Sequence, residues 1–167
     1  MEPVRTETIA AADGGSFNGH LVLPASGHGA GVLLLQEIFG VNAYIRDVAE
    51  RLANLGYVVM APDVFWRIEP GFEIDSSDVA NIEPALAVAG RWDADTGLSD
   101  LQAALAHLHD LDEVTGPVAV IGFCFGGTEA FRLAKHAQPA CAVSYYGSGV
   151  ADLLGDADSI TCPTMLH

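Results

Sequence analysis

The sequence predicts an α/β domain built on a mostly parallel β-sheet, and two observations indicate this fold class. Apolar runs of strand length alternate along the chain with segments whose apolar residues recur at helical spacing. One such run, residues 118–121, leads directly into a glycine-rich turn, as a strand does where it passes sharply into a helix. Because half of the 167 residues are hydrophobic, the chain can bury one substantial core. We therefore expect a single domain over residues 1–167.

The first half of the chain contains an expected hairpin, two central strands and one helix. Residues 4–10 and 20–23 should form antiparallel strands at one edge, around the turn at residues 13–15. Buried strands are expected at residues 31–36 and 57–61. The helix expected between them, residues 42–55, ends at Gly56. Its apolar face is expected to consist of Ile45, Val48, Leu52 and Leu55.

The second half begins with residues 64–81, where proline, glycine, aromatic and acidic residues predict a loop that covers a site. A helix is expected over residues 99–111, and a further helix over residues 127–135 follows the glycine-rich turn. Strands are expected at residues 141–145 and from residue 162. The inward face of the first of these helices should carry Leu101, Leu105 and Leu108.

The segment Gly122-Phe123-Cys124-Phe125-Gly126-Gly127 is typical of a nucleophile elbow with cysteine in the place of serine. Such an elbow holds its central residue at a strained backbone angle, which requires residues without side chains two positions before and two positions after. Gly122 and Gly126 meet this requirement. The thiol of Cys124 would then project from the carboxyl end of the sheet, toward the N–H groups of the following helix. This geometry predicts acyl transfer.

Charge, apolar runs and cysteine content exclude several classes of function. Twenty-two acidic residues against seven basic ones give a net charge of -15, which excludes a nucleic-acid-binding surface. No apolar run reaches membrane-spanning length and the first residues lack the apolar core of a signal peptide, so no membrane partner is expected. Cys141 and Cys162 are expected to be core residues. Three cysteines without close pairing predict a reduced, cytoplasmic protein, and neither metal-ligand spacing nor a cofactor fingerprint occurs.

An ordered set of motifs resembles the dienelactone hydrolase family, which consists of α/β-hydrolases with a cysteine nucleophile. The resemblance rests on the elbow and on residues 35–40, 57–63, 92–93 and 145–147, which together cover nearly the whole chain. It implies a three-layer α/β sandwich and hydrolysis of a small-molecule ester or lactone through an acyl-enzyme. It also implies that Cys124 is the nucleophile, that the Glu37 carboxylate influences its ionisation, and that the Ile38 and Phe125 backbone N–H groups form the oxyanion hole. Glu37 follows a buried strand, where desolvation would raise its pKa enough to accept a proton from the thiol.

The resemblance also implies a triad aspartate and histidine on loops that come after later strands, whereas the sequence ends at His167. We therefore expect the carboxyl-terminal part of the domain to be missing and full turnover to be impaired. His167, near the carboxyl end of its strand, is the best placed of the histidines, but the family histidine comes from a later loop. Such a fragment would also expose its final strand, so self-association is a further expectation.

Substrate contacts are the least specified part of the prediction. Members of this family hold a substrate carboxylate with arginines, and the candidates here are Arg91, before the Trp-Asp element, and Arg67, in the expected covering loop. Tyr146 belongs to the aromatic residues that would line an apolar pocket. Two alternatives to the hydrolase are a class I glutamine amidotransferase, which also uses a Gly-x-Cys-x-Gly elbow, and a non-catalytic fragment that pairs with a partner.

Overall fold

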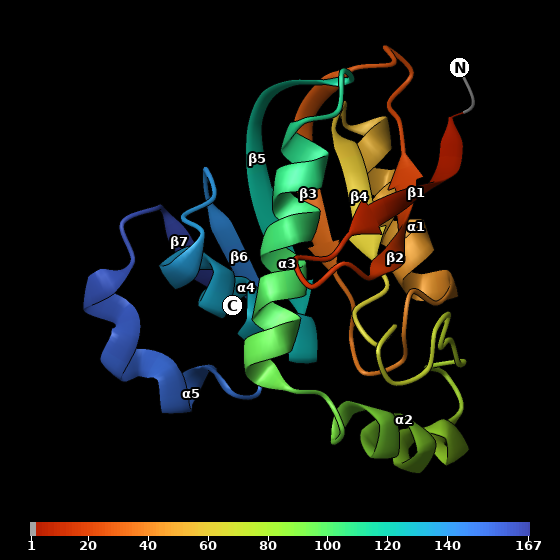
Figure 1. Cartoon of the computed structure of the whole chain (residues 1–167), viewed down its shortest axis with the longest axis vertical. Coiled ribbons are helices and arrows are strands. Elements are labelled where there is room, and N and C mark those ends of the chain that lie inside the picture. Colours follow the sequence, from red (N-terminus) through yellow and green to blue (C-terminus); the bar gives the residue numbers. More distant parts are fainter. Residues whose placement is uncertain (1–2) are drawn as a thin grey trace.

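A computed structural model describes residues 3–167, apart from the side chain of Asp156, and contains one seven-stranded sheet with the order β1-β2-β4-β3-β5-β6-β7 (Figure 1). β1 (Val4–Ala10) and β2 (Ser16–Val22) form the antiparallel hairpin expected at one edge. β2 also pairs antiparallel with β4 (Val58–Pro62). From β4 onward the sheet is parallel through β3 (Gly29–Leu35), β5 (Val114–Phe123), β6 (Ala142–Tyr145) and β7 (Thr164–Leu166). The predicted mostly parallel sheet is confirmed.

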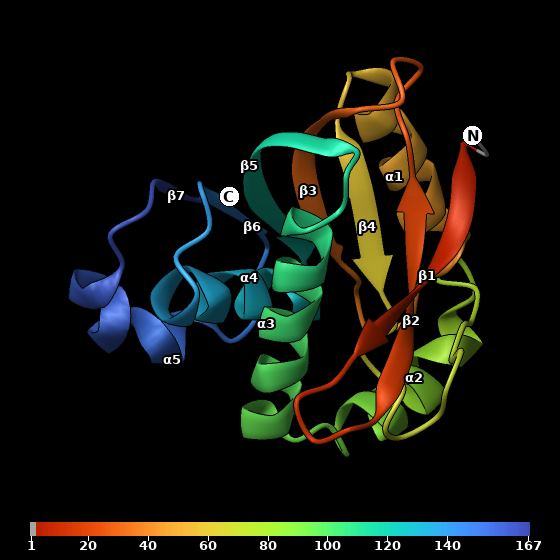
Figure 2. The same cartoon turned by 45° about the horizontal axis from the view of Figure 1, so that its top comes forward.

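Helices cover both faces of this sheet, which makes the three layers of the expected sandwich. α1 (Ala43–Asn54) packs on one face, and α3 (Ala94–His109) and α4 (Phe125–His136) pack on the other (Figure 1). The short helices α2 (Ile82–Ala89) and α5 (Val150–Leu153), with the 3-10 turns Val79–Asn81 and Leu154–Ser159, complete the connections. α2 lies beyond the carboxyl end of β4, on the side to which the arrow of β4 points (Figure 2).

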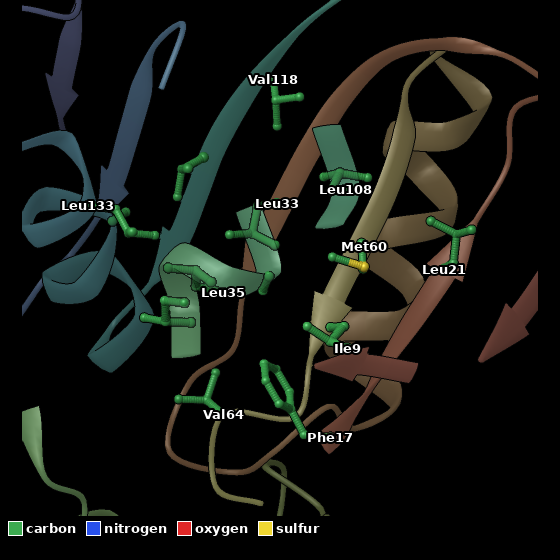
Figure 3. Packing of buried hydrophobic residues seen from close by; sticks show 14 of the residues in the cluster. Ile9, Phe17, Leu21, Leu33, Leu35, Met60, Val64, Leu108, Val118 and Leu133 are labelled. Carbon is green, nitrogen blue, oxygen red and sulfur yellow. The ribbon is translucent and has the colours of Figure 1, made fainter. Parts of the chain in front are cut away.

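The larger core cluster lies between the sheet and the α3/α4 layer (Figure 3). Alternate residues of the central strands, such as Leu33, Met60 and Val120, point into it and are fully buried. Leu108 of α3 and Leu133 of α4 meet them from the helical side. The other residues of the same strands pack against α1 in a second cluster. Because both faces of the central strands are buried, these strands form near-continuous apolar runs in the sequence.

Two expectations about helices were wrong in detail. Leu55 was expected on the buried face of the first helix, but it is the C-cap residue of α1 and is 75% exposed. Ala49 and Ala53 are buried in that face instead, because their small side chains let the helix approach the sheet. The helix expected from residue 99 begins at Ala94, where the Asp93 carboxylate caps it by accepting the Thr96 N–H over 2.9 Å.

The helix α2 was not expected at all. Pro84 and Gly90 are of residue types that favour loops. Pro84 nevertheless lies in the first turn of α2, where its missing N–H costs no helical hydrogen bond, and Gly90 is the C-cap residue. Cys141 and Cys162, which were expected in the core, are both only partly buried. Each lies just before the strand that follows it, outside the segment that the sheet covers.

Candidate active site

Cys124 occupies the sharp turn between β5 and α4, as the elbow motif predicted. Its backbone has φ 52° and ψ -113°, a conformation that an L-residue rarely adopts. The turn is held by a 2.9 Å hydrogen bond from the Cys124 N–H to the Tyr145 carbonyl of β6. The Gly126 N–H donates to the Gln36 carbonyl at the end of β3 over 3.0 Å. Backbone strain at Cys124 is therefore sustained by bonds to both neighbouring strands.

The two glycines of the elbow are required by close backbone contacts. A Cβ atom on Gly122 would overlap the Gly126 carbonyl oxygen. A Cβ atom on Gly126 would come within 2.5 Å of the carbonyl oxygens of both Leu35 and Gln36. Real Cβ atoms do not approach backbone this closely, so the helix α4 can lie against the end of β3 only because these positions lack side chains.

Burial and three neighbouring groups act on the Cys124 thiol, and their effects on its pKa oppose one another. Burial and the nearby negative charge of Glu37 raise the pKa, with burial the larger cause. Hydrogen bonds from the Phe125 N–H and from the Ser148 hydroxyl lower it. The balance leaves the pKa of the thiol above its usual value. The nucleophile therefore rests as a thiol at neutral pH, although donors that stabilise a thiolate are already in contact with it.

Glu37 lies where the sequence placed it, at the carboxyl end of β3 and beside the elbow. Burial raises the pKa of its carboxyl group, and a hydrogen bond from the Tyr146 hydroxyl to Oε1, 3.3 Å long, partly offsets this effect. The Ile38 N–H has no hydrogen-bond partner among the described residues 3–167, whereas the Phe125 N–H points at the thiol. The Phe125 amide is thus in contact with the thiol, and the Ile38 amide is left free to donate to another acceptor.

Known proteins resemble this chain over most of its length. The model of the dienelactone hydrolase family matches residues 17–167. The chain belongs to the dienelactone hydrolase family. It is 39% identical over 160 residues to a carboxymethylenebutenolidase of Pseudomonas sp., an alignment that covers 96% of this chain and 67% of that protein. A second relative, carboxymethylenebutenolidase 1 of Cupriavidus pinatubonensis, is 35% identical over 159 residues, covering 95% of this chain and 68% of the relative.

Solved structures agree with this membership in the dienelactone hydrolase family. A dienelactone hydrolase-like promiscuous phosphotriesterase from metagenomic libraries superposes with a TM-score of 0.72 at 27% identity, covering 99% of this chain and 68% of that one. An esterase of Pyrococcus furiosus has a TM-score of 0.70 at 20% identity, with 98% and 69% coverage, and shows the shared fold alone. The chain is accordingly a hydrolase of the ester and lactone type, and the glutamine amidotransferase alternative is not supported.

Arg67, one of the two arginines expected to hold a substrate carboxylate, is bound to acidic residues of the chain itself. Its guanidinium donates to both oxygens of the buried Asp100 over 2.7 and 2.8 Å, and to Asp13 over 2.7 Å. These partners raise its pKa further and use three of its five N–H donors, so the guanidinium is already paired with two carboxylates. The Trp66 indole N–H also donates to Asp100 over 2.8 Å, and Arg67 lies over the Trp66 ring. Arg67 therefore anchors the covering loop to α3.

Arg91, the other candidate, lies at the end of the α2 segment and is exposed. Its neighbour Trp92 packs edge-on against Phe125, with 4.9 Å between ring centroids, so Arg91 is connected to the elbow through two aromatic rings. The Tyr146 hydroxyl binds Glu37 while its ring packs against Phe123 with 6.0 Å between centroids, and the residue is 50% exposed. Its φ of 41° makes it the second strained residue at this edge of the sheet.

Within residues 3–167, the groups in contact with the thiol include no histidine. His107 lies 3.2 Å from Glu7, and the His167 ring packs against Tyr145 with a centroid distance of 5.3 Å. The described residues contain no group of three or more side chains arranged to hold a metal ion, and no helix among them is both long and apolar enough to cross a membrane.

Two residues of the site were not found from the sequence. Ser148 contacts the thiol, and the Tyr44 ring meets the Phe123 ring, beside Cys124, edge-on with 5.9 Å between centroids. From the local sequence, Ser148 belongs only to a turn and Tyr44 only to the start of a helix. Only the spatial neighbourhood of β5, β6 and α1 brings them to the nucleophile.

Proposed function

We propose that this chain binds a small ester or lactone at the carboxyl edge of its sheet and that Cys124 attacks the substrate carbonyl. The single observation that carries this proposal is the strained backbone of Cys124, which presents a partly buried thiol between the Glu37 carboxylate and the N–H groups of the elbow. Strain of this kind is maintained where it serves a function, and here it serves to expose a nucleophile.

The first step is a proton transfer from the Cys124 thiol to the Glu37 carboxylate, whose raised pKa suits it to accept a proton. The resulting thiolate forms a C–S bond to the carbonyl carbon, and the carbonyl oxygen becomes an oxyanion. The Ile38 and Phe125 N–H groups would donate to that oxyanion. Collapse of the intermediate breaks the C–O bond, and the departing alkoxide takes up a proton. In a lactone, the released alcohol stays attached to the acyl chain.

The Phe125 N–H has one role in the free protein and another during attack on the substrate. In the free protein this N–H lowers the pKa of the thiol by binding sulfur. During attack the same N–H would move its hydrogen bond to the developing oxyanion, 2.7 to 3.1 Å being the usual range for such a donor. The donor is therefore in place before the substrate arrives, which is the basis of electrostatic preorganisation.

Water must then hydrolyse the thioester, and this second step needs a general base. The described residues bring no histidine to the thiol. We therefore expect residues 1–167 alone to acylate faster than they deacylate, as enzymes do when a triad base is absent.

The substrate class that we propose is a lactone or small ester carrying a carboxylate. Its support is the relatives' name, carboxymethylenebutenolidase, together with exposed Arg91 beside the Trp92–Phe125 ring pair. Arg67 is left out of this proposal because Asp100 and Asp13 already bind it. Substitution of Arg91 by glutamine should weaken acylation by a carboxylated ester more than acylation by its neutral methyl ester.

A burst assay with an activated aryl ester tests the proposed function. The chain should release about one equivalent of the aryl alcohol rapidly, and mass spectrometry should find the acyl group on Cys124. Cys124→Ala should abolish the burst, whereas the matched variant Cys141→Ala should retain it, since Cys141 precedes β6 and lies away from the elbow. A burst that persists in Cys124→Ala would contradict the proposal, and absence of any burst would favour the non-catalytic alternative.

We also propose a cytoplasmic location and a tendency to self-associate. The first is supported by three cysteines that are all free in the structure, as in a reducing compartment. The second is supported by the edge strand β7, where Met165 and Leu166 are each 49% exposed. Cell fractionation tests the location, and sedimentation velocity at two concentrations tests the association.

A further inference from the structure

The connection between β3 and α1, residues 36–42, is attached to the covering loop by backbone contacts. The Ile74 N–H of the loop donates to the Phe39 carbonyl over 3.1 Å. Gly40, the next residue of the connection, pairs with Glu73 in an isolated antiparallel bridge. The covering loop is therefore bonded to the backbone that leads from the carboxyl end of the sheet into α1.

The two segments approach each other most closely at Gly40. Its φ is 80°, a left-handed conformation that glycine adopts without strain. A Cβ atom on Gly40 would overlap the Phe72 carbonyl oxygen. Because backbone meets backbone here with no flexible side chain between them, a shift of the covering loop must move the connection as well.

Arg46, near the start of α1, binds both segments. Its guanidinium donates to the two Glu73 carboxylate oxygens over 2.6 and 2.5 Å, and to the Val41 carbonyl over 2.6 Å. Two parallel bonds between a guanidinium and a carboxylate fix the orientation of both groups. Asn42 adds a longer bond, since its Nδ2 donates to the Ile74 carbonyl over 3.3 Å. Arg46 thus joins the covering loop, the connection and α1 at one point.

The Arg46–Glu73 pair is too exposed to be a main source of stability. Its side chains are 35% and 43% exposed, and ion pairs in water contribute little to the free energy of unfolding. Its geometry is nevertheless specific, because three hydrogen bonds converge on one guanidinium. The pair therefore fixes the position of the connection rather than the stability of the domain.

We propose that Arg46 is a positioning residue that orients the Ile38 N–H toward the oxyanion, by fixing the connection on which Ile38 lies. The inference rests on the proposed function, in which that N–H is one of the two oxyanion donors. Ile38 follows Glu37 and precedes the anchored residues 39–41. An oxyanion donor must come within about 2.7 to 3.1 Å of its acceptor, and a displacement of about 0.5 Å is enough to weaken such a site.

The ionisation of the nucleophile does not depend on Arg46. Among the described residues 3–167, the pKa of the Cys124 thiol is shifted by burial and by three groups other than Arg46. Burial and Tyr146 shift the pKa of Glu37. The charge of Arg46 is also balanced by its partner Glu73. Loss of the Arg46 guanidinium should therefore change the geometry of the connection and leave the thiol as reactive as before.

The test compares two reactions of Cys124, of which only one forms an oxyanion. Acylation by an activated aryl ester forms an oxyanion, whereas alkylation by iodoacetamide displaces iodide from a saturated carbon and forms none. Arg46→Gln should slow the acylation burst about tenfold, less than complete loss of one donor. Its alkylation rate between pH 6 and 10 should equal that of the wild type. Equal slowing of both reactions would indicate general damage to the elbow and would overturn the inference.

Two further variants of α1 separate geometry from charge. Arg51→Gln is the matched control, because it makes the same change on the same helix and breaks only the exposed pair with Asp47. Both of its rates should equal those of the wild type. Arg46→Lys keeps the charge but cannot form the bidentate pair, so it should slow acylation about fivefold. Acylation at the wild-type rate in Arg46→Lys would overturn the inference.

Glu73→Gln tests whether Arg46 acts through the covering loop. It should slow acylation about as much as Arg46→Gln does, and the double variant should be no slower than the slower single variant, because the two side chains act as one unit. Hydrogen exchange of the Ile74 amide, which binds the Phe39 carbonyl, should become about fivefold faster in each variant. Additive losses of acylation, or unchanged exchange at Ile74, would overturn the inference.

Failure of the proposed function gives a different result from failure of this inference. If Cys124 does not attack esters, the wild type itself shows no burst, and the oxyanion role of the connection is lost with the proposed function. If the wild type shows a burst that Arg46→Gln leaves unchanged, the proposed function stands and the positioning role of Arg46 is overturned.

Discussion

Asp100 accepts two hydrogen bonds from Arg67, although the first residue lies in the middle of α3 and the second lies in the loop that covers the edge of the sheet. The carboxylate is buried, and Arg67 is its cationic partner. Asp100→Ala removes the carboxylate and leaves the Trp66 and Arg67 donors without their acceptor. Breaking a largely buried pair costs about 3 kcal/mol, and urea denaturation should show a loss of this size.

The matched control for that substitution is Asp47→Ala, which breaks the exposed ion pair with Arg51 on α1. Both side chains of that pair are 63% exposed, so the change should lower the free energy of unfolding by less than about 0.5 kcal/mol. Equal losses in the two variants would show that Asp100 does not anchor the covering loop.

Gly126→Ala tests the geometry of the elbow. The added Cβ would press on the carbonyl oxygens of Leu35 and Gln36, so α4 must move away from β3. We expect a loss of about 3 kcal/mol in the free energy of unfolding and a loss of the acylation burst. Gly155→Ala is the control, because its Cβ would meet no atom within 4 Å. If Gly126→Ala retains the wild-type burst and stability, the elbow does not depend on this contact.

Glu129 of α4 should make stability depend on pH. Burial raises its pKa to about 7, from an ordinary value of 4.5, and Arg132 lowers it only in part. The folded protein therefore binds this proton more tightly than the unfolded chain does. Stability attributable to Glu129 is highest below about pH 4.5 and falls as the pH rises toward 7, by about 3 kcal/mol from linkage.

Urea midpoints of the wild type and of Glu129→Gln at pH 5 and pH 8 measure this effect. The variant should be relatively more stable at pH 8 than at pH 5, because glutamine carries no charge to bury. Glu83→Gln, on the exposed side of α2, is the control and should follow the wild type at both values. A Glu129→Gln variant that also follows the wild type would mean that the Glu129 carboxyl titrates normally.

The rate at which iodoacetamide alkylates Cys124 should report the effect of Ser148→Ala on the thiol. The serine hydroxyl lowers the pKa of Cys124 by donating to sulfur, so its loss should raise that pKa and slow alkylation at pH 8 about threefold. Ser148→Thr should preserve the wild-type rate because it keeps the hydroxyl. Ser26→Ala, whose hydroxyl bonds to the His28 carbonyl in a distant turn, is the control. A faster rate in Ser148→Ala would contradict the assigned direction of this hydrogen bond.

The positions of the strands along the chain and the elbow could be predicted because their signals are local. The apolar run that becomes β5 and the flanking Gly122 and Gly126 lie within ten residues of Cys124. Leu55 was misplaced because helical spacing does not reveal where a helix ends, and Gly56, with φ 102°, closes α1 one residue earlier than the apolar pattern implies.

The substrate-contact candidates were harder to assess because they depend on partners far away in the sequence. Nothing near Arg67 in the chain indicates that Asp13 and Asp100 will bind its guanidinium. Ser148 and Tyr44 are equally inconspicuous, since their contacts with Cys124 and Phe123 exist only after the sheet has assembled. Residue type and local spacing pointed to Cys124 and Glu37, whereas the contact of Ser148 with the thiol required three-dimensional structure.

The backbone bonds of the elbow also have a consequence for how the protein folds. The Gly126 N–H finds its acceptor in the carbonyl of Gln36, which directly follows β3. The Cys124 N–H finds its acceptor in the carbonyl of Tyr145 in β6. A nascent chain lacking either strand cannot hold the thiol in its strained position, and long-range parallel pairings form slowly. The native hydrogen-bond environment of Cys124 should therefore appear among the last events of folding, so its alkylation rate after dilution from urea would report completion of the sheet.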